Sequence, residues 1–578
     1  MRVHKLVFSC IFSLGGLVWG QDGVGPSPWP LTADGGQIPG ERCWPSQATW
    51  AAFNSSIGGR LIQTIPMAAA CYDGPHKDAQ HCAYVAKTWP EHYFQTSQPL
   101  GRWYPFNLTC PPIDASAARP STSCSLGQLL PYAVNITTPR DIREALAFAR
   151  KHSIRVSILN TGHDLNGRAD GFGSLSLWLR HMRRKVTFED VFASRCDKSG
   201  WDGSAIHIDG AYQWGDVHKV AKGNGVIVVG GGSSSPGATG GWLSGGGHGP
   251  ASRNYGLGAD QLLEAQVMLA NGTVVTADRC RHTDLFRALR GGGPGYGIVL
   301  STKIKAHPNV DVVTSHGLTV TPRDKDADNG RYLDAVSTMM QSHPGLVDSG
   351  FAGYVVWFPR RYNHSLWTIG KSRAEADAAF ASVRAKLAAF NESLLITESF
   401  REYGDYWSFY ESELDRSDTP GDTLLLTSRF IDKESPDGSD KSLLMLVSGG
   451  KVFEDAADKT SGLHPAWRRS PMVLISSSRV PRYASPETRN ALAEYVTSVK
   501  GAAAKKLAPN TGGYMNEGDG GDPDYISTFY GANYASHLAA KDAYDPKHVF
   551  YCPTCVGAER FVDRPDGALC RVSSQGSS

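Results

Sequence analysis

The sequence predicts an α+β protein with more than one domain. Its 578 residues are 41% apolar and 20% charged, which is ample for a large core. Residues 125–308 alternate between helical and strand patterns, and this sequence pattern changes after about residue 310. Residues 21–124 are instead rich in Pro, Gly, Trp and Cys, with little periodicity. We therefore expect an irregular N-terminal extension followed by two mixed domains.

Residues 1–20 predict a secretory signal peptide. Arg2 and Lys5 form a charged start, and the apolar run from Leu6 to Val18 is too short to span a bilayer. Small residues before Gln21 are suited to cleavage at that point. A buried N-terminal helix is the alternative. The sequence thus predicts a secreted, extracellular protein.

Ten cysteines follow the predicted signal peptide, and an even number in an oxidising environment indicates disulfides. Five of them lie from Cys43 to Cys124, so we expect disulfides to hold the extension, although the pairing cannot be deduced. Cys552 and Cys555 have the spacing of a redox motif, but outside the cytosol we interpret them as disulfide half-cystines. Six glycosylation sequons are typical of a secreted protein. The sequons are at Asn54, Asn107, Asn135, Asn271, Asn363 and Asn391.

Residues 125–308 predict a domain of alternating helices and strands. "TTPRDIREALAFARKHSI" predicts a helix capped by Thr138 and Asp141, and the strand Val156–Leu159 follows it. "AIHIDG" and "VIVVGG" predict two further strands with a helix between them. "QLLEAQVMLANGTVVTA" predicts a hairpin with Asn271-Gly272 as a type I′ turn. "DLFRALRGGG" then predicts a helix, and "GIVLSTKIKAH" a strand.

Residues 309–509 predict a second α+β domain, and residues 510–578 a C-terminal segment. "GFAGYVVWF" predicts a strand, "SRAEADAAFASVRAKLAAF" an amphipathic helix, and the last segment a helix that ends near Asp545. The net charge is +2, and no basic run carries interleaved aromatic residues. We therefore expect neither nucleic acid nor a membrane surface as a partner.

Twelve of the 63 glycines lie between Gly223 and Gly249, within and before "VVGGGSSSPGATGGWLSGGGHGP". Glycine lets the backbone approach a ligand closely, and successive backbone N–H groups can bind an anion. A flexible linker is the alternative, but apolar strands flank the run. The chain lacks the Lys-Ser or Lys-Thr of a P-loop, and "GGGPGYG" does not match the Rossmann fingerprint. It also lacks HExxH, Gly-x-Ser-x-Gly and obvious metal-ligand spacing, so we expect no metal site.

Three blocks of the sequence occur in a specific order. They are "NTGHDLNG", then "TGGWLSGGGHGPASRNYGLGADQLLEAQVMLANGTVV" with "DLFRALRGGGPGYGIVLSTKIKAHP", and finally "GGYMNEGD" with "FYGANYASHLAAKDAYDPKHVF". They cover roughly residues 125–308 and 510–552. Together they resemble the vanillyl-alcohol-oxidase and p-cresol-methylhydroxylase family of FAD enzymes, in its berberine-bridge-enzyme-like branch.

The resemblance implies a two-lobed fold, in which one lobe binds FAD and an antiparallel-sheet lobe covers the flavin and holds the substrate. It implies that residues 160–164 wrap the pyrophosphate and that His163 is bonded to the flavin 8α-methyl; a hydrogen-bonded turn histidine is the alternative. Tyr514, in a Tyr-x-Asn pattern, and His248 are candidates for the catalytic base, and a core tyrosine is the alternative for Tyr514. The implied cofactor-binding residues are Asn160, Thr161, Gly162, His163, Asp164, Ser234, Gly240, Gly245, Gly246 and Ile298.

The chain departs from the family pattern at several positions. Many relatives carry a second flavin link, through a cysteine whose position, counted back from Ser244, is Ser234 here. We therefore expect FAD with a single attachment, through His163. Two active-site tyrosines of plant relatives map to Leu165 and His248, so their base arrangement does not transfer. The residue that gates oxygen in relatives maps to Gly237, whose small size favours an oxidase over a dehydrogenase.

We therefore expect a secreted FAD-dependent oxidase that takes hydride from an alcohol and reduces dioxygen to hydrogen peroxide. A carbohydrate, a phenolic alcohol and a secondary metabolite are the candidate substrates. A dehydrogenase, a biosynthetic tailoring enzyme and a flavin-carrying binding protein with little turnover remain as alternatives. The aromatic residues from Phe400 to Tyr410, with Tyr354 and Trp357, are candidates for the substrate site, and core packing is their alternative role.

Overall fold

The computed structural model describes residues 39, 44–106, 108–113, 123–324, 329–414, 420–432, 442–564 and 567–572. The predicted signal peptide, Cys43 and Asn107 lie outside the described residues. In the part of the chain that is described, no helix is long and apolar enough to cross a membrane.

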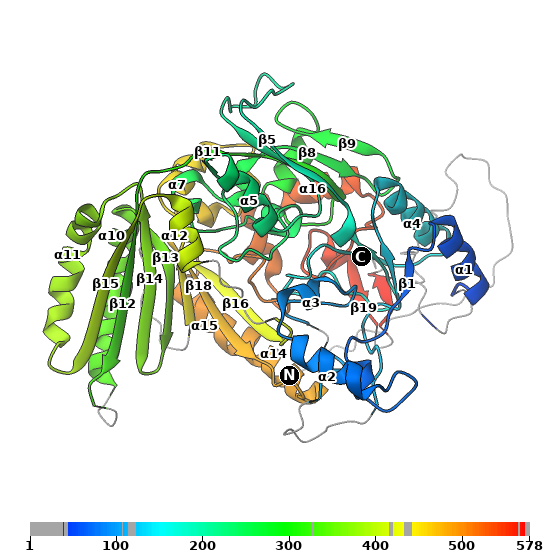
Figure 1. Cartoon of the computed structure of the whole chain (residues 1–578), viewed down its shortest axis with the longest axis horizontal. Coiled ribbons are helices and arrows are strands. Elements are labelled where there is room, and N and C mark those ends of the chain that lie inside the picture. The colour runs from blue at the N-terminus through cyan, green and yellow to red at the C-terminus, as the bar shows by residue number, and fades with distance from the viewer. Residues whose placement is uncertain are drawn as a thin grey trace, which may run out of the picture.

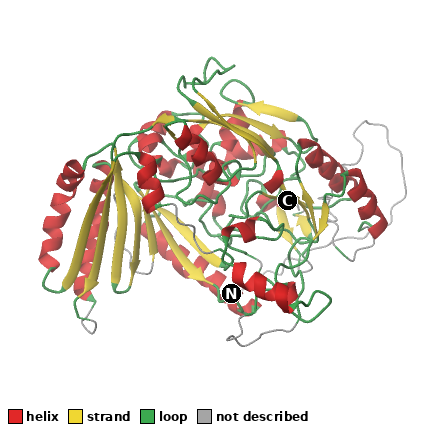
Figure 2. Ribbon diagram, viewed as in Figure 1, coloured by secondary structure: helices red, strands yellow, loops and turns green. Residues whose placement is uncertain are grey.

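One lobe is built on an antiparallel sheet of seven strands, seen at the left of Figure 1. In sheet order the strands are β15 (Leu394–Tyr403), β12 (Val313–Pro322), β14 (Arg361–Ile369), β13 (Phe351–Phe358), β17 (Ser442–Leu446), β18 (Met472–Arg479) and β16 (Leu424–Ile431). The helices α10 (Gly330–Asp348) and α11 (Arg373–Leu387) pack together against its outer face (Figure 2). Ser372 and Glu375 form a capping box at the start of α11. The outer face of this seven-stranded lobe is therefore covered, and its inner face is left for the rest of the molecule.

The other part of the molecule, here called the two-sheet lobe, contains two smaller sheets. In sheet order the first has β1 (Leu61–Gln63), β2 (Tyr132–Asn135), β4 (Leu175–Trp178) and β3 (Val156–Leu159), and the second has β5 (Arg183–Glu189), β6 (Ala205–Gly210), β10 (Ile298–Lys305), β8 (Leu262–Met268) and β9 (Val274–Ala277). Two further strands, β7 (Val226–Ile227) and β11 (His307–Pro308), pair with each other. The helices of this lobe are α4 (Pro139–Lys151), α5 (Trp214–Gly223), α6 (Gly241–Ser244), α7 (Ser252–Tyr255), α8 (Gly258–Gln261) and α9 (Thr283–Leu289).

The predicted elements of residues 125–308 are largely confirmed, with one correction at a turn. Thr138 and Asp141 form the expected capping box of α4. β8 and β9 form the expected hairpin, but the type I′ turn is wrong. Gly272 has a φ of +84°, while Asn271 is not in the left-handed region, and the Gly272 N–H donates to the Leu269 carbonyl. A type I turn followed by a left-handed glycine closes the hairpin, so only one residue needs a positive φ.

The N-terminal extension is more regular than its composition predicts. It forms α1 (Gln47–Ser56), α2 (Ala79–Thr88) and α3 (His92–Thr96), and its strand β1 adds to the first sheet. In α1, Trp50 stacks on Tyr132 of β2, and Phe53 stacks on Phe148 of α4. These tertiary aromatic contacts stabilise α1, and a pattern read along the chain does not reveal them.

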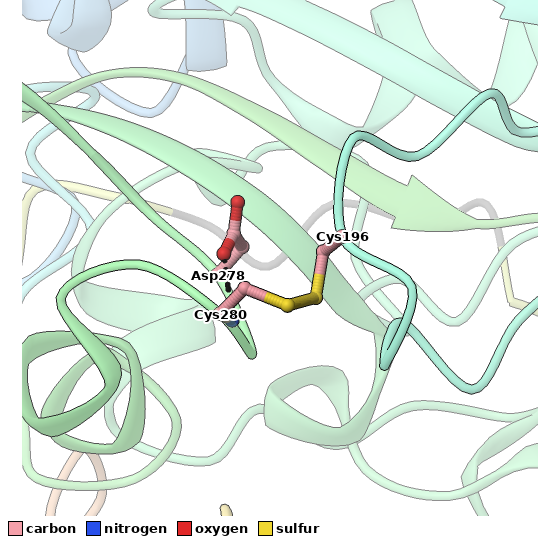
Figure 3. A group of neighbouring side chains, drawn as sticks. All are labelled: Cys196, Asp278 and Cys280. Carbon is pink, nitrogen blue, oxygen red and sulfur yellow. Dashed lines mark hydrogen bonds between the residues drawn. A yellow bond between two sulfur atoms is a disulfide. The ribbon is translucent and has the colours of Figure 1, made fainter.

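Four disulfides confirm the prediction of pairing for eight of the ten cysteines. They are Cys71–Cys82, Cys110–Cys124, Cys196–Cys280 and Cys552–Cys555. The first two hold the extension, and the last closes within its own motif. Figure 3 shows Asp278 beside the bond between Cys196 and Cys280. Because these two sulfurs are bonded to each other and the Asp278 carboxylate accepts from the Cys280 N–H at 2.8 Å, this trio is a covalent clip between two loops and not a metal-ligand set.

The C-terminal segment crosses from the seven-stranded lobe to the two-sheet lobe. After β18 come α14 (Pro486–Tyr495) and α15 (Ala502–Leu507), and α16 (Tyr534–Tyr544) then packs on α9. On the way, the backbone of Tyr514 bonds to the Ser428 hydroxyl of β16, and the Asn516 side chain donates to the Gly241 carbonyl of α6. Residues 514–517 therefore contact both lobes. The described part of the C-terminal segment closes with the hairpin of β19 (Phe561–Asp563) and β20 (Leu569–Arg571).

The expected domain boundaries fall at recognisable points of the fold. The boundary at 308/309 lies between β11 and β12, and that at 509/510 lies just after α15. α12 (Tyr406–Glu413) and α13 (Lys451–Glu454) belong to the segment between them. The division into residues 125–308, 309–509 and 510–578 stays a prediction.

Candidate functional site

A cavity of about 640 Å³ lies where the two lobes meet. Its walls come from the loop 160–169 after β3, the glycine-rich segment 231–248, residues 514–517 and the strands β16 to β18. At another part of the wall, Val156, Ile298 and Phe550 line it from the core of the two-sheet lobe. A cavity of this size can enclose an extended ligand.

His163 lines this cavity from the loop that follows β3. Buried β3 ends at Leu159, and Gly162 then turns with a φ of +76°. Glycine is required there, because a side chain would meet the Gly101 carbonyl. The His163 ring stacks on Trp103 at 4.6 Å between ring centres, and its Nε2 lies 2.8 Å from the Ser235 hydroxyl oxygen. Burial, aided by His92, lowers the pKa of His163 to about 3. The imidazole is therefore neutral near pH 7 and can act as a nucleophile.

Residues of the N-terminal extension contact His163 and the residues that hold it. Trp103 is fully buried, and it also contacts the His92 ring edge-on at 4.9 Å. His92 Nε2 lies 3.2 Å from Gln213 Oε1, and Gln213 Nε2 donates to the Ser235 carbonyl at 3.0 Å. The two partners of His163, an indole face and a serine hydroxyl, are thus joined in one network. This role of Trp103 could not be predicted from the sequence, because the extension shows little periodicity.

Of the three consecutive serines 233–235, Ser234 is not the one that meets His163. Ser234 packs against Gly215 of α5 and does not line the cavity, whereas Ser233 does. The Ser233 and Ser235 hydroxyls are 2.8 Å apart, and Ser235 reaches His163. The expected contact of Ser234 with the cofactor is therefore not supported by the cavity lining. None of the three serines is a cysteine, so the expectation of one flavin link is unchanged.

The glycine-rich segment leaves open space along one wall of the cavity. A Cβ at Gly240, which has a φ of +98°, or at Gly241 would meet no atom within 4 Å, and both residues line the cavity. Asn160 Nδ2 donates to the Thr239 carbonyl at 3.1 Å, while its buried Oδ1 has no partner among the described residues. Bare backbone and an unpaired amide oxygen are features that fit a large polar ligand such as FAD.

Gly237 does not open the space that its size predicts. A Cβ there would lie 2.5 Å from Asn160 Nδ2, so the amide already occupies that position. Glycine is needed at this point because Asn160 approaches the backbone closely. The small size of Gly237 therefore does not by itself provide room for oxygen.

The remaining predicted cofactor residues divide into two groups. Thr161, Asp164 and Ile298 line the cavity, and burial raises the pKa of the Asp164 carboxyl. Gly245 and Gly246 lie behind the wall instead, where a Cβ would meet Asn516 and Leu463 respectively. Gly245 lets Asn516 approach the glycine-rich segment, and Gly246 lets Leu463 pack against it.

The two predicted catalytic residues lie together in the cavity wall. The rings of Tyr514 and His248 meet edge-on at 5.2 Å between centres. The Tyr514 hydroxyl accepts a hydrogen bond from Asn516 Nδ2 at 2.9 Å, and burial with the nearby Glu517 carboxylate holds the pKa of Tyr514 well above its usual range. His248 Nε2 lies 3.4 Å from Glu517 Oε1. These surroundings keep the tyrosine protonated and place a carboxylate beside the histidine.

Sequence reasoning missed Glu517, although it lies three residues after Tyr514. Its side chain lines the cavity, and its buried Oε2 has no partner in the described part of the chain. Of the aromatic residues considered for the substrate site, Tyr354 lines the cavity, while Trp357 faces the outer core under α10 and α11. Residues from Tyr406 to Tyr410 also pack in a core cluster. Their alternative role as core residues is therefore the one that the fold supports.

Sequence comparisons agree with this geometry. The family described as FAD binding domain matches residues 131–278, and the family described as berberine and berberine like matches residues 513–557. The chain is 53% identical to the FAD-linked oxidoreductase hmp9 of Hypomyces subiculosus, over 92% of this chain and 90% of that one. It is 36% identical to the FAD-linked oxidoreductase apf9 of Gibberella fujikuroi, over 92% of this chain and 96% of that one.

Solved structures give the same result for the fold. The VAO-type flavoprotein MtVAO713 from Myceliophthora thermophila C1 has a TM-score of 0.91 at 54% identity, covering 93% of this chain and 100% of its own. A glucooligosaccharide oxidase from Acremonium strictum, described with 6-S-cysteinyl, 8α-N1-histidyl FAD, has a TM-score of 0.60 at 16% identity, covering 74% and 92%. The second likeness shows the fold alone. Together the comparisons confirm the expected two-lobed fold.

Proposed function

Because the chain belongs to the berberine-bridge-enzyme-like branch of the vanillyl-alcohol-oxidase family of FAD-linked oxidoreductases, we propose that it is a secreted oxidase that converts an alcohol to a carbonyl compound. One alcohol and one dioxygen molecule give one carbonyl compound and one hydrogen peroxide, so atoms and electrons balance. The observation that carries the proposal is that His163 and the group of His248, Tyr514 and Glu517 line one cavity.

Residues 125–308 and 510–578 hold FAD in this proposal, and residues 309–509 cover it. The loop 160–164 and the bare backbone at Gly240 and Gly241 would hold the FAD pyrophosphate. The unpaired Asn160 Oδ1 supplies a hydrogen-bond acceptor. Bound FAD supplies the two-electron acceptor for alcohol oxidation.

His163 is the single covalent attachment point in this proposal. When its Nε2–H donates to Ser235, the lone pair of the neutral ring lies on Nδ1, the atom that would hold the flavin at its 8α carbon. Attachment would replace one C–H bond of the methyl group with the C–N bond, and the two hydrogens lost from the methyl group and the imidazole would reduce one dioxygen to hydrogen peroxide. The stacked Trp103 fixes the plane of the ring. Serine at each of positions 233–235 leaves no sulfur for a second bond.

The pair of His248 and Glu517 accepts the hydroxyl proton of the alcohol. A carboxylate beside an imidazole stabilises the imidazolium that forms when the ring takes a proton, and Glu517 lies 3.4 Å from His248 Nε2. Tyr514 is the weaker base, because its raised pKa keeps the proton on the phenol. In the proposed site Tyr514 instead orients the substrate oxygen by donating a hydrogen bond.

A flavin-dependent dehydrogenase is the second candidate function. The Asn160 amide fills the position beside Gly237, so the site lacks the extra room for oxygen that the sequence predicts there. A dehydrogenase turns over with an artificial electron acceptor and forms no peroxide.

Purified protein tests both functions directly. The oxidase predicts visible flavin absorbance, a pellet that stays yellow after acid precipitation, and stoichiometric peroxide when the dithionite-reduced protein meets oxygen. The His163→Ala variant should release the yellow colour on precipitation. Protein without flavin absorbance refutes both functions, and reduced protein that makes no peroxide refutes the oxidase. A flavin that no alcohol bleaches under anaerobic conditions would favour a binding protein, and a product of changed carbon skeleton a tailoring enzyme.

A further inference from the structure

The two lobes give the cavity walls of opposite character. The two-sheet lobe and the C-terminal segment contribute His248, Tyr514 and Glu517, whereas the inner face of the seven-stranded sheet contributes aliphatic side chains. These are Leu424 and Leu426 of β16, Leu443 and Met445 of β17, and Ile475 of β18, here called the aliphatic wall. Every residue of β16, β17 and β18 that lines the cavity belongs to this wall.

Strand pairing places the five side chains on one face. Leu443 is paired with Ile475, and residues two apart on a strand point to the same side. Tyr354 of β13, which is paired with Met445, also belongs to this face and lines the cavity. Leu424 and Leu443 are only partly buried by the protein. The aliphatic wall is thus a continuous surface with room for a ligand against it.

The cavity continues this apolar character beside the wall. Leu165, where plant relatives carry a tyrosine, and Leu414 at the end of α12 also line it. Glu413, which directly precedes Leu414 and also lines the cavity, already accepts hydrogen bonds from Tyr403 and Ser315. Its acceptor capacity is therefore partly used within the seven-stranded lobe.

Such a wall discriminates between classes of alcohol. A sugar in the cavity would turn several hydroxyl groups toward side chains that can neither donate nor accept, and each buried hydroxyl without a partner weakens binding by roughly tenfold or more. An apolar carbon skeleton leaves no hydroxyl unpaired there and gains binding free energy from contact with the wall. Each methylene that moves from water onto the wall strengthens binding about fourfold, which corresponds to about 0.8 kcal/mol.

We propose that the alcohol bound at this site is carried on an apolar, non-carbohydrate skeleton. Its hydroxyl faces His248 and Glu517, and its carbon skeleton contacts the aliphatic wall. This inference rests on the proposed oxidase function and narrows its substrate class. The sugar substrates named for structural relatives that are under 25% identical to this chain do not transfer to this cavity.

A homologous series of simple alcohols tests the substrate class. Isothermal titration of the purified holoprotein with 1-butanol, 1-hexanol, 1-octanol and 1-decanol should give a Kd that falls about fourfold for each added methylene. Maltotriose serves as the carbohydrate probe and should bind more weakly than 1-octanol. A Kd that does not change with chain length, or tighter binding of maltotriose, would overturn the proposal.

Two variants locate the effect on the wall. Leu443→Asn and Met445→Gln each place an amide in it, and either should weaken 1-octanol binding by roughly tenfold. Leu395→Asn is the matched control, because Leu395 lies on β15 of the same sheet and is 49% exposed. Equal loss in the control and in the wall variants would refute the assignment. Bound flavin content reports correct folding in each case.

Failure of this inference is distinguishable from failure of the oxidase function. Titration with alcohols does not require turnover, whereas flavin absorbance and peroxide formation from the reduced protein do not require a substrate. A protein that passes the flavin and peroxide tests but prefers maltotriose keeps its proposed function and loses the apolar substrate class.

Discussion

Replacing Ser235 with alanine should slow covalent attachment of FAD about fivefold to tenfold. The Ser235 hydroxyl lies 2.8 Å from His163 Nε2 in a buried setting. Losing one such hydrogen bond costs about 1–1.4 kcal/mol, and about 1.4 kcal/mol is a factor of ten in rate. Without Ser235, the histidine no longer holds its proton on Nε2, so a smaller fraction of molecules presents the Nδ1 lone pair to the flavin.

The assay compares two neighbouring serines. Apoprotein from flavin-depleted cells is mixed with FAD, and the covalent fraction is followed over time by flavin fluorescence of the denatured, acid-precipitated protein. Ser234→Ala is the control, because Ser234 packs against Gly215 and not against His163. It should attach FAD at the wild-type rate. Equal slowing in both variants, or wild-type attachment in Ser235→Ala, would refute the assigned role of Ser235.

Three further predictions follow from the same geometry. Glu517→Gln should lower the rate of flavin bleaching by an alcohol about 100-fold or more, and Tyr514→Phe less, in stopped-flow measurements; the reverse order would make Tyr514 the base. Gly240→Ala should lower bound FAD content, because its Cβ enters the cavity. Gly59→Ala is the control, at a φ of +79° in open space, and should leave FAD content unchanged. Equal loss of FAD in both variants would contradict the role of Gly240 in the FAD-binding wall. Burial lowers the pKa of His343 to about 3. Its contribution to the free energy of unfolding is therefore complete above pH 6.5 and is lost as the pH falls toward 3, by about 1.4 kcal/mol per pH unit. In denaturant unfolding, the stability of His343→Leu should depend less steeply on pH than that of the wild type, and equal dependence would disprove this role of His343.

Local signals in the sequence predicted many of the helices and strands. The start of α4 is one example, because Thr138 and Asp141 are three residues apart and satisfy the first N–H groups of their own helix. α1 is a counterexample, because its stability depends on aromatic stacking with residues such as Phe148, far along the chain. The turn at Asn271 was mispredicted because Asn-Gly suits two kinds of hairpin turn. In a type I′ turn both residues have a positive φ, whereas in the observed type I turn with a left-handed glycine only Gly272 does.

The site residues also divide into those that local sequence patterns predict and those that depend on contacts between distant segments. The sequence singled out His163, His248 and Tyr514 because each lies in a short block with a recognisable pattern. It did not single out Trp103, which lies outside the recognised blocks, or Glu517, which lies in "GGYMNEGD" but has no assigned role in that pattern. Their roles arise from contacts with the histidines, and the contact between Glu517 and His248 joins residues 269 positions apart.

The sequence by itself determined the family, the FAD-binding blocks, the capping of α4 and the absence of cysteine at positions 233–235. These are properties of residue type and of spacing within one segment. Only the tertiary structure decided that Ser235, rather than Ser234, faces His163, because it packs Ser234 against Gly215 of α5 and brings the loop after β3 next to Ser235. It also decided that aliphatic residues of three strands share one cavity wall. That outcome depends on strand order and register, which require contacts between segments far apart in the chain.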